Sequence, residues 1–164
     1  MEKSLIIDGN NLKVEDVYNV VKNNISVKFP DGDDFKKQIN ASREYLESFI
    51  KKGYPVYGVT TGFGDSCHNQ INHGNAEKLQ ESLVNYHGIG IGENFTEGEG
   101  KAVTLVRLNS NIKGYSGIKS DTVELMKEFI NRGISPVIPL LGSVGASGDL
   151  TPLSYLAATL MGKR

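Results

Sequence analysis

The sequence predicts a mainly α-helical fold that forms a single domain over residues 1–164. Apolar residues recur at intervals of three and four along much of the chain, which is the spacing of one helix face. Polar capping residues precede most of these stretches and glycines follow them, as they do at the two ends of helices. A chain of 164 residues is also long enough to bury a core of its own.

The N-terminal third is predicted to hold one extended segment and two helices. Residues 5–12 form either a short strand or an extended arm, with a turn signal at residues 8–10. Valines at helical spacing predict a helix over residues 14–27. A second helix follows the turn at residues 30–33 and ends at Gly53.

The middle third is predicted to contain two more helices. Residues 54–59 form a short extended piece that leads into a glycine-rich loop. Asn75 is a candidate cap for the next helix. Thr96 and Glu99 fit a capping box at the start of a helix that runs toward Gly114.

The last third is predicted to hold the two final helices. Ser120 caps the first of them, and Gly133 ends it. Thr151 as N-cap, with Pro152 at the first helical position, starts the second. The whole chain is therefore expected to contain one or two short extended pieces at most.

Composition excludes several classes of function. The 18 basic and 19 acidic residues nearly balance, and no basic stripe indicates a nucleic-acid partner. No apolar run is long enough to span a membrane. The single cysteine, Cys67, allows no internal disulfide and is typical of a reducing compartment, so we expect a cytoplasmic protein.

The most informative stretch is GSVGASGDL at residues 142–150. Glycine has no Cβ, so the backbone nitrogen of Gly148 is as unhindered as a backbone nitrogen can be. In a tight bend this nitrogen can attack the carbonyl carbon of Ala146, and loss of two waters, one of them from Ser147, leaves a methylidene-imidazolone. The alternative is an ordinary turn before a helix, which the tripeptide taken alone favours.

Three blocks together resemble one known family, the aromatic amino acid ammonia-lyases and aminomutases. Residues 142–150 are similar to its cofactor-forming motif, and YGVTTGFG at residues 57–64 is similar to its tyrosine loop. Residues 79–92 agree more weakly, with Tyr86 and His87 in the place of the pair that selects the substrate. The blocks occur in the family's order, and the resemblance extends from residue 5 to the end of the chain.

The resemblance implies a fold, a cofactor and an assembly. The fold is the N-terminal domain of the fumarase/aspartase-like superfamily, with short extended segments near the N-terminus and the tyrosine loop. The cofactor is 4-methylidene-imidazol-5-one, formed autocatalytically from Ala146, Ser147 and Gly148. The family's enzymes are homotetramers several times longer than this chain, so the chain is expected to be an incomplete N-terminal domain.

Tyr57 is implied to be the base that removes the β-proton of the substrate, and Gly64 in the same loop to contact the substrate. A phenol titrates near about pH 10, so a tyrosine that acts as a base at neutral pH needs a nearby cation, helix end or hydrogen-bond donor. The alternative for Tyr57 is a half-buried tyrosine at the end of a strand.

Tyr86 and His87 are implied to face the side chain of the substrate. His87 matches the histidine lyases, whereas Tyr86 is bulkier than the residue those enzymes carry. The alternative is a pair of polar residues at a helix end, where a histidine is favourable.

No metal or nucleotide site is expected. Cys67, His68 and His73 crowd one polar loop instead of forming the separated pairs of a tetrahedral site. The glycines of residues 58–64 and 88–92 match neither the P-loop nor the dinucleotide fingerprint.

The reaction that the resemblance implies is the elimination of ammonia from an aromatic L-amino acid. Histidine, giving urocanate, is the first choice, and phenylalanine or tyrosine comes next. A 2,3-aminomutase of the same family and a non-catalytic folding or interaction module are the alternatives. The chain on its own is expected to be inactive, with residues 146–148 left as ordinary peptide.

Overall fold

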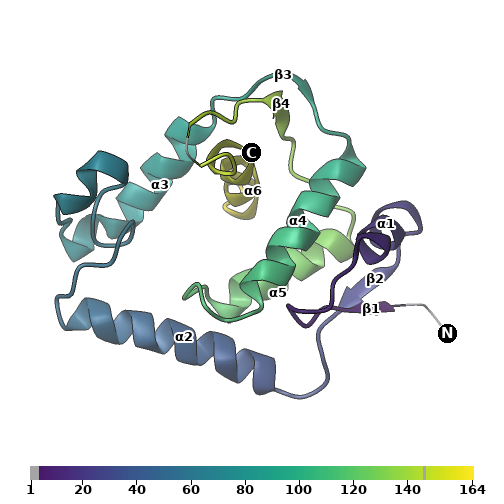
Figure 1. Ribbon diagram of the computed structural model, residues 1–164, viewed down its shortest axis with the longest axis horizontal. Coiled ribbons are helices and arrows are strands. Elements are labelled where there is room, and N and C mark those ends of the chain that lie inside the picture. The colour runs from purple at the N-terminus through teal and green to yellow at the C-terminus, as the bar shows by residue number, and fades with distance from the viewer. Residues whose placement is uncertain (1–3, 146) are drawn as a thin grey trace.

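The computed structural model describes residues 4–145 and 147–164. Six α-helices dominate these residues. The prediction of a mainly α-helical fold is therefore confirmed. In chain order the helices are α1 (Val14–Lys22), α2 (Asp34–Lys51), α3 (Ala76–His87), α4 (Glu97–Asn111), α5 (Ser120–Asn131) and α6 (Leu150–Leu160). Figure 1 shows α4 and α5 side by side, with α2 along the lower edge of the view and α6 inside the outline.

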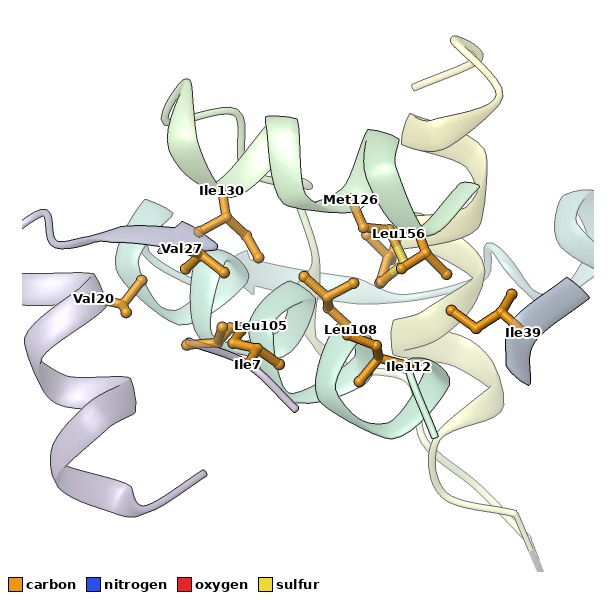
Figure 2. Close-up of a cluster of buried hydrophobic side chains, with 11 residues drawn as sticks. Ile7, Val20, Val27, Ile39, Leu105, Leu108, Ile112, Met126, Ile130 and Leu156 are labelled. Atoms are coloured by element: carbon orange, nitrogen blue, oxygen red, sulfur yellow. The ribbon is translucent and has the colours of Figure 1, made fainter. Parts of the chain in front are cut away.

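The core lies where α4 packs against α5, with α1 and α6 at its sides. Figure 2 shows the apolar side chains of these helices pointing toward one another. The described residues that are buried in this core cluster come from α1, α2, α4, α5 and α6, and from the N-terminal segments around Ile7 and Val27, whereas α3 contributes none. They are Ile7, Val20, Val27, Ile39, Leu105, Leu108, Ile112, Val123, Met126, Ile130 and Leu156.

The predicted helix over residues 14–27 is confirmed over residues 14–22 and wrong over residues 23–27. α1 ends at Lys22, and Asn24 takes a left-handed φ of 50°, which interrupts the helix. The chain then forms β2 (Ser26–Lys28), which pairs in parallel with β1 (Ser4–Ile6). Val27 is further held by the Asn131 side chain, which accepts from its N–H at 2.7 Å and donates to its carbonyl at 2.9 Å.

A second strand pair was also missed. β3 (Ile91–Asn94) pairs antiparallel with β4 (Pro139–Leu141), so the described residues hold four short strands where one or two extended pieces were expected. Conversely, the expected extended piece at residues 54–59 gives way to a turn over residues 57–60.

The helix starts agree with the prediction to within two residues. Thr96 and Glu99 form the predicted capping box of α4: the hydroxyl of Thr96 accepts from the N–H of Glu99 at 3.3 Å, and the carboxylate of Glu99 accepts from the N–H of Thr96 at 2.7 Å. Asn75 occupies the N-cap position of α3 as expected. Ser120 is the first residue of α5 instead of its cap.

The start of α6 differs slightly from the prediction. Asp149 is its N-cap and Leu150 its first residue, so Thr151 and Pro152 lie inside the first turn. Proline is tolerated there because the first N–H groups of a helix have no intrahelical partner.

No helix within residues 4–145 and 147–164 is both long enough and apolar enough to cross a membrane.

Candidate functional site

The tyrosine loop, residues 57–64, follows α2 and leads into the short 3-10 helix η1 (Gly64–His68). The Tyr57 side chain is 65% exposed, and its hydroxyl accepts a hydrogen bond from the backbone N–H of Gly64 at 3.0 Å. Phe63 approaches the Tyr57 ring edge-on, with 6.4 Å between the ring centroids. The two predicted site residues of this block, Tyr57 and Gly64, are therefore in direct contact, and the phenol oxygen is open to solvent.

The rest of the tyrosine loop is held by hydrogen bonds to two buried threonines and by close backbone packing. Thr60 and Thr61 are buried, and their hydroxyls accept from the backbone N–H groups of Val56 and Gly58. A Cβ on Gly62 would lie 2.6 Å from the carbonyl oxygen of Ser66, so glycine is required there by close packing. The loop thus has a fixed backbone below an exposed tyrosine.

Tyr86 and His87 form the last turn of α3. The Nδ1 atom of His87 lies 2.9 Å from the carbonyl oxygen of Leu83, and since a carbonyl only accepts, Nδ1 must donate. In the neutral ring this leaves Nε2 as a free acceptor. The Tyr86 side chain is 60% exposed, and its ring lies against that of His87 with 4.2 Å between centroids.

The candidate cofactor loop, residues 142–149, connects β4 to α6. The hydroxyl of Ser147 donates to Oδ1 of Asp149 at 3.0 Å, and the hydroxyl of Ser143 donates to the carbonyl of Gly148. Ser147, Gly148 and Asp149 are all exposed. Ala146, the third predicted member of the site, lies outside the described residues.

The base of this loop is packed against the third block. A Cβ on Gly142 would lie 3.0 Å from Cα of Gly90 and 2.7 Å from Cγ2 of Thr151. The N–H of Gly90 also donates to the hydroxyl of Tyr155 at 3.0 Å. The segment after Tyr86 and His87 therefore lies directly against the cofactor loop.

Helix α3 connects the three blocks. At its first half the amide of Gln80 donates to the carbonyl of Gly58 in the tyrosine loop, and at its end the chain continues to Gly90 (Figure 1). No hydrogen bond among the described residues joins Tyr57 to Ser147 or Gly148. Within one copy of the chain, then, the tyrosine loop and the cofactor loop each contact the α3 block, and no direct bond links them.

Sequence reasoning missed Gln80, Thr151 as a packing residue, and Tyr155. Gln80 lies within residues 79–92, one of the three blocks found in the sequence, but the residues around it do not indicate that its side chain binds a carbonyl 22 residues earlier. Tyr155 stands 65 residues from its partner Gly90, a pairing that one sequence does not reveal.

Two of the three glycines in the cofactor loop, Gly142 and Gly148, predict different effects of alanine on stability. Gly142→Ala forces its Cβ into Thr151 and Gly90, and we expect it to cost about 1–3 kcal/mol, the usual range for overpacking. In Gly148→Ala the added Cβ meets no atom within 4 Å in the part of the chain that the structure describes, and the φ is outside the left-handed region, so we expect a change within about 0.5 kcal/mol. Thermal denaturation of the two variants and the parent chain checks this, and equal loss of stability in both would contradict the described loop.

Comparison with known proteins supports the family that the sequence motifs indicate. The model of the aromatic amino acid lyase family matches residues 12–164. A histidine ammonia-lyase of Streptococcus pyogenes serotype M3 is 38% identical over 162 residues, which are 99% of this chain and 31% of that protein. The chain thus spans about a third of the length of the curated relatives it matches.

Solved structures of the family superimpose closely. The tyrosine aminomutase from Streptomyces globisporus is 36% identical, with a TM-score of 0.88 over 97% of this chain and 29% of that one. The histidine ammonia-lyase from Trypanosoma cruzi is 30% identical, with a TM-score of 0.79 over 93% of this chain and 29% of that one. The family model covers most of the chain, the sequence identities and the fold agree with it, and the chain belongs to the aromatic amino acid lyase family.

Proposed function

We propose that this chain is the N-terminal part of an ammonia-lyase that acts on an aromatic L-amino acid through an electrophile made from Ala146, Ser147 and Gly148. The observation that carries the proposal is the setting of Gly148. Neither packing nor backbone conformation requires glycine at this position, because a Cβ would meet no atom of the described residues within 4 Å and the φ is not left-handed. Glycine at position 148 does, however, supply a backbone nitrogen with no Cβ beside it, which is the group that ring closure needs.

The side chains around Ser147 and Gly148 are placed to support closure of the ring. The Gly148 nitrogen bonds to the carbonyl carbon of Ala146, and the Ala146 oxygen leaves as water with the hydrogens of the Gly148 and Ser147 backbone N–H groups. The Cα hydrogen and the hydroxyl of Ser147 leave as the second water. The Asp149 carboxylate holds the Ser147 hydroxyl, and Ser143 holds the Gly148 carbonyl. The start of α6 lies immediately after, and its unpaired N–H groups favour negative charge there.

When formed, the methylidene-imidazolone supplies an electrophile for the substrate amine and makes that amine a better leaving group. Tyr57 removes the β-proton of the substrate. Its hydroxyl is exposed, and the single N–H of Gly64 fixes the position of the oxygen. A general base must meet its proton at hydrogen-bond distance, which an exposed and fixed oxygen allows.

Histidine is the proposed substrate, with urocanate as the product; phenylalanine and tyrosine come next. The free Nε2 of His87 can accept from a donor on an imidazole ring, and Tyr86 lies beside it with its ring exposed. The names of the streptococcal relatives support the same choice: a second histidine ammonia-lyase, from Streptococcus gordonii, is 40% identical over 95% of this chain and 30% of that protein.

A 2,3-aminomutase is the second candidate, because a tyrosine aminomutase is among the structures that superimpose closely. One assay separates the two functions. The enzyme that contains this chain is supplied with L-histidine, L-phenylalanine and L-tyrosine, and the products are resolved by chromatography. Urocanate or a cinnamate with free ammonia supports the lyase, a β-amino acid supports the mutase, and no product from any of the three contradicts both.

We further propose that the isolated chain is not catalytic and that residues 146–148 remain ordinary peptide in it. Ring closure needs surrounding structure that compresses the bend, and Ser147 and Gly148 are exposed in this chain. In the complete enzyme we expect the homotetramer of the family. Turnover of any of the three amino acids by the purified chain would contradict the first part of this proposal.

A further inference from the structure

We infer that Gln80 is a positioning residue that fastens the tyrosine loop to helix α3. The inference rests on the proposed function, since it concerns how Tyr57 is held. The amide nitrogen of Gln80 donates to the carbonyl oxygen of Gly58, the residue directly after Tyr57. Among the described residues this is the one hydrogen bond between residues 57–64 and α3.

The backbone of Gly58 is shaped for this contact. Its φ is +70°, a left-handed conformation that residues with a Cβ rarely adopt. A Cβ at this position would also lie 2.8 Å from the ring of Phe63. Glycine therefore permits the turn in which the carbonyl at position 58 faces α3 while the Tyr57 ring stays exposed.

The position of Gln80 along α3 relates the tyrosine loop to Tyr86 and His87. Gln80 and His87 are seven residues apart in one helix, so they share a face and are separated by about 10 Å along the axis. The Gln80 bond thus sets the tyrosine loop two helical turns from the residues proposed to contact the substrate side chain. A helix is stiff over this length, which makes it a fixed spacer between the two.

Hydrogen exchange of the 164-residue chain, read by mass spectrometry on peptides covering residues 57–64, tests the contact directly. Gln80→Met keeps the length and helix propensity of the side chain but removes the donor. We expect amides of the loop to exchange about 3- to 10-fold faster in this variant, the effect of losing one ordinary hydrogen bond. Gln80→Lys restores a donor and should return the exchange close to that of the parent chain.

Gln38 offers a matched control. It also lies on a helix and donates from its amide to a backbone carbonyl, that of Lys113, at 2.8 Å. Gln38→Met should leave exchange in residues 57–64 unchanged. Unchanged loop exchange in Gln80→Met, or equal loosening by Gln38→Met, would overturn the inference; unchanged exchange in α4 and α5 verifies that each variant is folded.

The outcome is separable from that of the proposed function. In the complete enzyme, Gln80→Met should lower kcat by a larger factor than it raises KM, because the base in the loop is displaced while the contacts of Tyr86 and His87 with the substrate remain. If Tyr57→Phe leaves turnover intact but Gln80→Met still loosens the loop, the base role fails and the contact stands. If Tyr57→Phe is inactive and Gln80→Met changes neither exchange nor kcat, the base role stands and the inference about Gln80 fails.

Discussion

Replacing Ser147 with alanine in the complete enzyme is expected to lower kcat by about 10⁴-fold or more, because no electrophile can form without the hydroxyl that leaves as water. The folded structure should be retained, since Ser147 is exposed and its described hydrogen bond is a surface one to Asp149. Activity is measured with L-histidine, L-phenylalanine and L-tyrosine, and the mass of the peptide over residues 142–149 is measured in parallel.

Ser110→Ala is the control for this variant. Ser110 is an exposed serine of α4 outside the three blocks, and its loss should alter neither turnover nor the peptide mass. Substantial turnover by Ser147→Ala would contradict the assignment of residues 146–148 as the source of the cofactor.

Replacing Tyr57 with phenylalanine is expected to lower kcat by about 10²–10⁴-fold, the contribution typical of one general base. The substitution removes only the hydroxyl, so the ring contact with Phe63 and the backbone of the loop should persist. Unlike Ser147→Ala, this variant should still show the loss of two waters in the cofactor peptide. The two measurements together separate formation of the electrophile from its use.

Tyr54→Phe serves as the matched control. Tyr54 lies three residues earlier, its side chain is 52% exposed, and its ring packs against Phe49 with 4.9 Å between centroids. It should retain the activity of the parent enzyme. Equal activity of Tyr57→Phe and Tyr54→Phe would remove Tyr57 from the reaction.

The helices could be predicted because their signals are local. The capping box of Thr96 and Glu99 lies within four residues, and the apolar face of α5 repeats at Val123, Met126 and Ile130. The strands could be predicted only in part. The extended segment expected at residues 5–12 overlaps β1, whereas β2, β3 and β4 were missed, because each is only three or four residues long and depends on a distant partner. Ser4 pairs with Ser26, and Ile91 with Leu141, and neither pairing has a local marker.

The candidate site divides in the same way. Tyr57, Gly64, Tyr86, His87, Ser147 and Gly148 were named from contiguous motifs, and the contact between Tyr57 and Gly64 arises within eight residues. The residues that hold the motifs in place escaped prediction. Two of these contacts join residues that are far apart in sequence: Gln80 binds the carbonyl of Gly58, and Tyr155 binds the N–H of Gly90. The third contact is the packing of Thr151 against Gly142.

The proposed cofactor is tested most directly by the mass of the peptide that covers residues 142–149 in the complete enzyme, compared with the same peptide from Ser147→Ala. We expect a peptide lighter than its sequence by two waters in the parent enzyme and a peptide of full mass in the variant. A full-mass peptide in an enzyme that turns over an aromatic amino acid would contradict the proposal, because catalysis would then proceed without the electrophile from Ala146, Ser147 and Gly148.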